Sequence, residues 1–260
     1  MPTRVVIHAG FHKTGTTSIQ KTLRENRTAL EPDVRIILRA GMVALCEAAR
    51  GYSQSKSAWD LGLVQFETAE LLQRIAGHKG LVLISSEDLA GHMPGRRGLT
   101  SYAAAPKLMQ AIANAATEVL PDTPVSFFFT TRAAKSWLQS CYVQHLRATR
   151  ITQSVDEYTA SYKRSADLSG IIANVAKSLP KHEVAQAALE DCSQSRLGPL
   201  DALLDHAGVS QGARRLIISL PPANTSPPQG KLDRLLELNR SDLSKDALRT
   251  AKKALNGQSF

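Results

Sequence analysis

The sequence predicts an α/β fold in which a central parallel sheet is flanked by helices. Three largely apolar runs, at residues 5–7, 81–84 and 125–129, have the composition of strands that are buried on both faces. Segments with apolar residues at helical spacing follow these runs, so strands and helices alternate along the chain. We expect a single domain over residues 1–260, because no repeat, long linker or second core divides the sequence.

The elements can be assigned in chain order. The first strand leads through a glycine-bracketed loop into a helix that begins at about residues 14–16 and carries Ile19, Leu23 and Leu30 on one face. Residues 41–78 predict a helical insertion with a polar break at 51–57, acting as a lid or a substrate wall. The other expected elements are strands at 33–39, 80–89, 124–132 and 182–189, helices at 104–120, 134–150, 198–207 and 245–255, mostly helix at 153–178, a short strand or edge at 215–220 and a loop at 221–228.

The composition excludes several classes of protein. Apolar residues make up 43% and charged residues 21%, as in ordinary globular proteins. No apolar run approaches the about 20 residues of a membrane span, and a strand begins too early for a signal peptide. Three scattered cysteines indicate a reducing compartment, so we expect a cytoplasmic protein without a membrane partner. The net charge of +9 favours anionic partners, but no basic run with interleaved aromatic residues predicts a nucleic-acid groove.

The loop after the first strand has the features of an anion site. The first amides of a helix lack internal partners, and the helix dipole is positive at that end. Lys13 adds a full charge, while Thr14, Thr16 and Thr17 add hydroxyl donors. A turn with threonine caps is the alternative, but the convergence of two glycines, a lysine and paired threonines favours a phosphate.

The spacing of this loop distinguishes two phosphate chemistries. Gly10 and Gly15 have the spacing of the nucleotide-triphosphate loop G-x-x-x-x-G-K-[ST], but Thr16 stands at the lysine position and Lys13 lies inside the loop. Residues 13–17, Lys-Thr-Gly-Thr-Thr, resemble the 5′-phosphosulfate loop of the sulfotransferases that use 3′-phosphoadenosine 5′-phosphosulfate (PAPS). The resemblance implies a three-layer fold like that of P-loop NTPases, with residues 13–18, including Gly15 and Ser18, binding the donor.

A second pair of residues supports the resemblance. Arg132 ends a predicted strand, and Ser140 follows eight residues later in a helix, about two turns on, so both side chains can face one ligand. Sulfotransferases of this family bind the 3′-phosphate of PAPS with such a pair. The alternative is a strand-end arginine in a salt bridge and a surface serine. The resemblance also assigns Asn224 and Ser226 to the nucleotide, because many bacterial members have a similar Asn-x-Ser late in the chain.

Candidate catalytic residues follow from position and from the resemblance. Glu87 lies just after a buried strand, and ligands of open parallel sheets bind beyond the carboxyl ends of the strands. In the family the base is a glutamate or a histidine, which implies Glu87, with His12 as the second candidate. Lys13 would stabilise the leaving oxygen, and His92, Arg96 and Arg97 are candidates for substrate contact. The alternative role of Glu87 is a capping or salt-bridging carboxylate.

The sequence therefore predicts transfer of a sulfuryl group from PAPS to a hydroxyl or amine of a small-molecule or carbohydrate acceptor. PAP is the product, and no metal is required. An ATP-dependent P-loop kinase is the alternative enzyme, in which Glu87 and Asp88 would serve the magnesium ion. The displaced lysine argues against it. A nucleotide-binding protein without catalysis is the alternative of a different class, and the sequence leaves the oligomeric state open.

Overall fold

The computed structural model describes residues 1–31, 33–192, 194–220 and 227–257, and in these residues it contains a five-stranded sheet with the order β2-β3-β1-β4-β5. All neighbouring strands are parallel, which confirms the predicted fold class. The strands are β1 (Arg4–His8), β2 (Val34–Leu38), β3 (Leu81–Ser85), β4 (Val125–Thr131) and β5 (Val184–Ala188).

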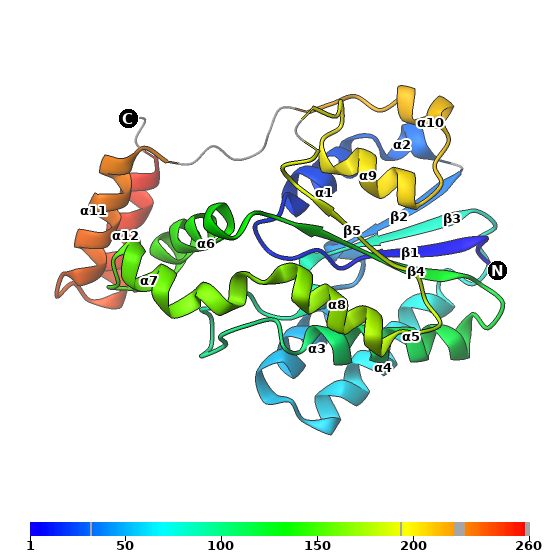
Figure 1. Cartoon of the computed structure of the whole chain (residues 1–260), viewed down its shortest axis with the longest axis horizontal. Helices are drawn as coiled ribbons and strands as arrows, with labels where there is room; N and C mark the ends of the chain where they lie inside the picture. The colour runs from blue at the N-terminus through cyan, green and yellow to red at the C-terminus, as the bar shows by residue number, and fades with distance from the viewer. Residues whose placement is uncertain (32, 193, 221–226, 258–260) are drawn as a thin grey trace.

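Helices cover both faces of the sheet and extend beyond its carboxyl end (Figure 1). One face carries α1 (Thr16–Glu25), α2 (Arg27–Leu30), α9 (Pro199–His206) and α10 (Gln211–Arg215). The other carries α3 (Val43–Ser55), α4 (Ala58–Gln73), α5 (Ala105–Val119) and α8 (Leu168–Ser178). Beyond the carboxyl ends of the strands lie α6 (Ala134–Ala148), α7 (Val155–Tyr162), α11 (Gln229–Arg240) and α12 (Lys245–Gly257). Short 3-10 turns are η1 (Arg39–Gly41), η2 (Glu87–Ala90) and η3 (Lys163–Ala166).

The strands hold the three layers together through the alternation of their side chains. Val5 and Ile7 of β1 belong to the core beneath α3, α4, α5 and α8, whereas Val6 belongs to the core beneath α1 and α9. Phe127 and Phe128 of β4 divide between the same two cores. Because β1, β3 and β4 are buried on both faces, these strands are mostly apolar, which is why they could be predicted from the sequence.

Several boundaries differ from the sequence-based expectation. The first helix does not reach Leu30, because α1 ends at Glu25 and Asn26 separates it from α2. The Asn26 side chain forms two hydrogen bonds with the backbone of Ile218, at 2.7 and 3.0 Å. The prediction of a strand at 215–220 was wrong. Helix α10 ends at Arg215, and residues 216–220 form no strand. Helix α11 was not predicted from the sequence.

The insertion at 41–78 is the connection between β2 and β3. Its helices α3 and α4 bury Cys46, Val64 and Leu72 in the larger core, and the predicted break shortens to Lys56 and Ser57. Ser57 caps α4 by accepting a hydrogen bond from the backbone of Asp60 at 3.1 Å. Within the described part of the chain, no helix is both long and apolar enough to span a bilayer.

Candidate active site

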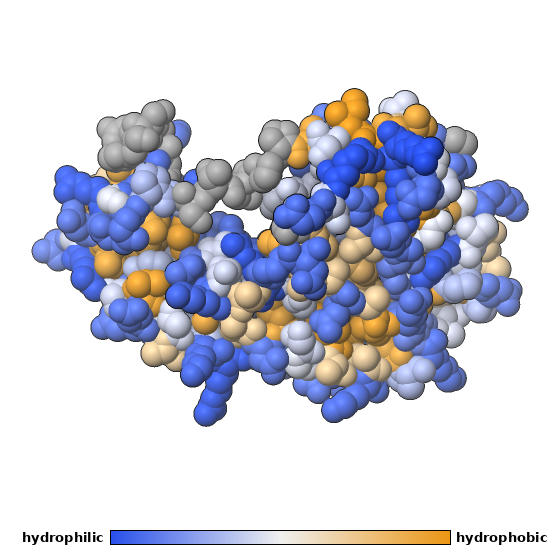
Figure 2. All heavy atoms as spheres, turned by 45° about the horizontal axis from the view of Figure 1, so that its top comes forward, coloured by the Kyte–Doolittle hydropathy of each residue, from blue (hydrophilic) through white to orange (hydrophobic). Residues whose placement is uncertain are grey.

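A cleft of about 670 Å³ opens at the carboxyl ends of the strands. Figure 2 shows that one face of the molecule is hollowed between the α11–α12 end and the body that holds the sheet, with hydrophilic side chains around the hollow. The cleft brings together most of the predicted site residues, namely His12, Lys13, Gly15, Thr16, Thr17, Ser18, Glu87, Arg132 and Ser140. The described residues that line it include none from 41–78, so the lid or wall role stays a prediction.

The loop between β1 and α1 requires its glycines. Gly10 and Gly15 have φ angles of 50° and 93°, and Lys13 between them has a φ of 69°. A Cβ atom on Gly10 would lie 2.5 Å from Cγ2 of Thr16, and one on Gly15 would lie 3.0 Å from Cδ1 of Leu189. The backbone therefore folds closely over the first turn of the helix, which a larger residue would prevent.

This loop presents backbone donors and a cation to the cleft. The first helical hydrogen bond runs from the Ile19 amide to the Gly15 carbonyl at 3.2 Å, so the amides of Thr16, Thr17 and Ser18 precede it at the positive end of α1. Burial lowers the pKa of Lys13, and the nearby charges of Arg147 and Arg132 lower it further. A bound anion would offset both effects and favour the charged lysine.

The side chain of Thr14 has a different role from those of Thr16 and Thr17. Its hydroxyl is buried, donates to the Phe11 carbonyl at 2.7 Å and accepts from the Thr130 hydroxyl, also at 2.7 Å. The side chain therefore fixes the loop against β4 and does not line the cleft. Only the backbone of Thr14 is left for the predicted role in donor binding.

Helix α6 supplies the far wall of the cleft. Arg132 precedes the helix and donates to the Lys13 carbonyl at 3.4 Å, while Ser140 lines the same cleft two turns into α6. Val143, Gln144 and Arg147 also line the cleft. Sequence reasoning missed Arg147, although its spacing of seven from Ser140 places both on one helix face.

Glu87 begins η2 at the end of β3 and faces the cleft. Its Oε2 atom accepts a hydrogen bond from Nε2 of Gln20 on α1 at 2.7 Å. Among the described residues no hydrogen bond reaches Oε1, so this oxygen is available to a ligand. Gln20 was not predicted, because the contact joins elements that are distant in the sequence.

His12 has both ring nitrogens engaged. The Tyr102 hydroxyl accepts from the His12 amide at 3.1 Å and lies 3.0 Å from Nδ1 of the same residue. The other ring nitrogen, Nε2, lies 3.5 Å from Oδ1 of Asp88. Trp137 also donates to the His12 carbonyl, at 2.9 Å. Both ring nitrogens thus lie against protein partners, whereas Glu87 faces the cleft, which favours Glu87 over His12 as the base.

Asp88 anchors this network. Burial opposes its ionised form, but hydrogen bonds from His12 and Arg39 outweigh burial and hold the pKa of Asp88 well below its ordinary range. Arg39 donates to Oδ2 at 2.7 Å, and Arg50 lies 3.6 Å from the same oxygen. Both carboxylate oxygens of Asp88 are therefore committed within the protein.

Not all of the remaining candidate residues line the cleft. Arg96 lines the cleft, whereas His92 and Arg97 are not among its lining residues. Asn224 and Ser226 lie outside the described residues. In the described ranges, no group of three or more histidine, cysteine or acidic side chains is placed to hold a metal ion.

Among known proteins, this chain is similar in its fold to a solved structure. No protein-family profile matches the sequence, and no curated protein matches it. A solved structure described as a sulfotransferase from Alicyclobacillus acidocaldarius aligns with 96% of this chain and 99% of its own, at 16% identity and a TM-score of 0.49.

The Asp88 network predicts a specific pH dependence of stability. Since the folded-state pKa is lowered, the unfolded chain binds more protons in acid, and the stabilisation by Asp88 is complete above the ordinary pKa of about 4 and lost below it. Asp88→Asn should lower the free energy of unfolding at pH 6 by on the order of 1–3 kcal/mol. It should also lose less stability than the wild type between pH 6 and pH 3, measured by urea unfolding. Asp122→Asn, at an exposed position, is the control, and equal pH slopes for wild type and Asp88→Asn would contradict this account.

Proposed function

We propose that this protein transfers a sulfuryl group from PAPS to a hydroxyl or amine of an acceptor, which is a small molecule or a glycan. The observation that carries the proposal is the convergence of Lys13, Glu87 and Arg132 on one cleft at the ends of β1, β3 and β4. The three free cysteines, Cys46, Cys141 and Cys192, are buried, which accords with the cytoplasmic location that we also propose.

The charge of the cleft suits a doubly phosphorylated nucleotide. Its described lining includes five basic side chains and a single carboxylate, that of Glu87; the basic residues are Lys13, Arg96, Arg132, Arg147 and Arg196. The amides of residues 16–18 and the hydroxyls of Thr16 and Thr17 would hold the 5′-phosphosulfate. Arg132 and Ser140 would hold the 3′-phosphate, and the family resemblance adds Asn224 and Ser226 as donor contacts.

The chemical step assigns one role to each charged group. Glu87 accepts the proton of the acceptor hydroxyl as its oxygen attacks sulfur in line with the leaving group. The new oxygen–sulfur bond forms while the bond from sulfur to the bridging oxygen breaks, and PAP leaves with the electron pair on that oxygen. Lys13 and the helix amides stabilise the charge that develops there. The proton on Glu87 then passes to water.

The kinase alternative is less well supported by the same residues. Thr16 stands at the lysine position of a nucleotide-triphosphate loop, so the cation that would reach the terminal phosphates is missing from that point. Asp88, one of two candidate carboxylates for magnesium, is occupied by His12 and Arg39. A nucleotide-binding protein without catalysis would share the donor site but would not need Glu87.

Replacing Arg132 should weaken the binding of ligands that have a 3′-phosphate more than the binding of ligands that lack one. Arg132→Ala should weaken PAP binding by on the order of 2–3 kcal/mol, because it removes a charge-assisted contact, and should affect adenosine 5′-phosphosulfate much less. Calorimetric titration of both ligands measures the difference, with Arg164→Ala as an exposed control. Equal losses for the two ligands would refute the assignment of Arg132 to the 3′-phosphate.

Replacing Glu87 should separate catalysis from donor binding. Glu87→Gln should lower kcat for sulfuryl transfer from labelled PAPS by about 10²–10⁴-fold, because general base catalysis is lost. PAP affinity should stay within about twofold, since the carboxylate is proposed to act on the acceptor. Glu118→Gln removes the same charge from an exposed position and should leave turnover unchanged. Undiminished turnover in Glu87→Gln would exclude Glu87 as the base.

A further inference from the structure

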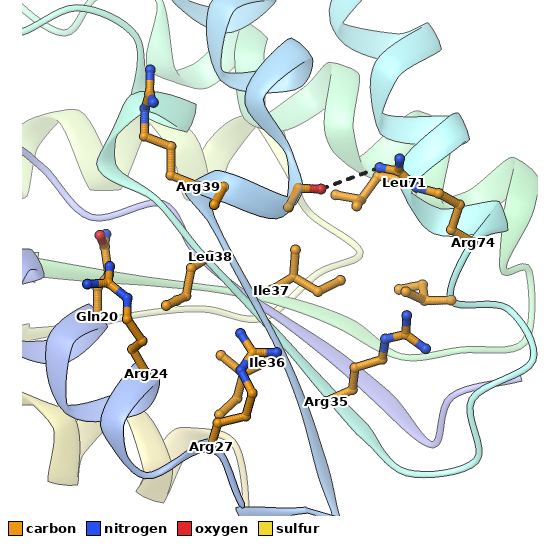
Figure 3. A pocket seen from close by; sticks show the side chains of 13 residues that line it. Gln20, Arg24, Arg27, Arg35, Ile36, Ile37, Leu38, Arg39, Leu71 and Arg74 are labelled. Carbon is orange, nitrogen blue, oxygen red and sulfur yellow. Dashed lines mark hydrogen bonds between the residues drawn. The ribbon is translucent and has the colours of Figure 1, made fainter.

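A second hollow, of about 480 Å³, runs along β2 between α1–α2 on one side and α4 on the other (Figure 3). Within the described residues, β2 is an edge strand that pairs with β3 alone, so its outer side is open. We call this hollow the β2 groove. Its described lining residues are Gln20, Arg24, Arg27, Arg35, Ile36, Ile37, Leu38, Arg39, Ala40, Gly41, Leu71, Arg74 and Ile75.

The β2 groove is strongly cationic. Its described lining includes five arginines and neither aspartate nor glutamate. Arg39 is paired with Asp88 and Glu47, whereas within the described residues the other four arginines form no ion pair; these are Arg24, Arg27, Arg35 and Arg74. In Figure 3 the side chains of Arg24 and Arg27 stand on one side of β2 and those of Arg35 and Arg74 on the other. Like charges around one hollow repel each other, and a bound anion would relieve that repulsion.

The β2 groove meets the active-site cleft at the proposed base. Gln20 lines the groove and donates its hydrogen bond to Glu87, which lines the cleft. Arg39, at the same end of the groove, binds Asp88, the neighbour of Glu87. A molecule lying in the groove would therefore end beside Glu87.

The strand order places the groove on the acceptor side. Across the sheet, β2 carries the groove, β3 leads to Glu87, β1 leads to the Lys13 loop and β4 leads to Arg132. The donor sites proposed above thus occupy β1 and β4, and the base separates them from the groove. The arginines of the groove are consequently placed for the acceptor and not for PAPS.

We propose, resting on the sulfuryl-transfer function above, that the β2 groove binds the acceptor and that the acceptor is an anionic glycan chain. Arginine pairs in a planar, bidentate way with the carboxylate or sulfate groups that such a chain carries. The five residues of β2 extend about 16 Å, which suits a chain of several units. A glycan also presents the hydroxyls on which Glu87 would act. The described lining holds no aromatic side chain on which the bases of a nucleic acid would stack.

The test measures binding to the groove separately from binding to the donor site. The probe is a fluorescently labelled, unsulfated chondroitin oligosaccharide, which has a carboxylate on alternate sugars, and a neutral chitin oligosaccharide of equal length is the comparison. Arg35→Gln/Arg74→Gln should bind the acidic probe at least about tenfold more weakly than the wild type, because two charge-assisted contacts are lost. Arg164→Gln/Arg249→Gln removes the same charge from exposed positions and should change affinity less than about twofold. The neutral probe should bind weakly to all three proteins.

Three results would overturn the proposal: equal losses in the two double variants, binding of the neutral probe as tight as that of the acidic probe, or tighter binding of poly-glutamate or single-stranded DNA. PAP titration of the same proteins should give unchanged affinity, because the groove arginines lie outside the donor cleft. PAP binding without groove-dependent glycan binding overturns the groove proposal alone. Groove-dependent glycan binding without PAP binding overturns the proposed donor and leaves the groove as a site for acidic glycans.

Discussion

The close approach of the β1–α1 loop to the first turn of α1 is the constraint on which the rest of the site depends. Gly10 and Gly15 allow the positive φ angles that bring the loop over the helix start, and no space is left there for larger side chains. The Thr14 hydroxyl ties the loop to β4, while Phe11 packs against the rings of Tyr102 and Phe129. The amides of the helix start are therefore fixed before any ligand arrives, which is the condition for electrostatic stabilisation of developing charge.

The same region shows how adjacent carboxylates acquire different roles. Glu87 and Asp88 follow β3 directly, yet Asp88 turns to His12, Arg39 and Arg50, whereas Glu87 faces the cleft. The paired arginines and His12 keep Asp88 ionised, so it serves as a structural anchor for the loop that carries Lys13. Glu87 has a neutral amide, that of Gln20, as its partner and retains an oxygen for a substrate. This division supports the choice of Glu87 over His12 as the proposed base.

The features that could be predicted from the sequence are those that depend on neighbouring residues alone. Strands buried on both faces are continuously apolar, and the Lys13–Thr17 segment combines glycine geometry with donors, so both could be predicted without tertiary contacts. Two hydrogen bonds of the site, of Gln20 with Glu87 and of Tyr102 with His12, could not be predicted from the sequence. They join residues at least 67 positions apart. The expected strand at 215–220 failed because Asn26, from α1's end, holds that segment by side-chain hydrogen bonds. The β2 groove could not be predicted from the sequence, because its five arginines come from five separate places in the fold, namely α1, α2, β2, η1 and the C-cap of α4.

The most direct measurement is a calorimetric titration of the purified protein with PAP in the absence of metal, in parallel with ATP and Mg²⁺. The cleft, with Lys13 inside the loop, Arg132 beside it and Ser140 on α6, predicts tight binding of PAP and little binding of ATP. Preference for ATP with magnesium would contradict the account, because it would mean that the displaced lysine does not select a phosphosulfate.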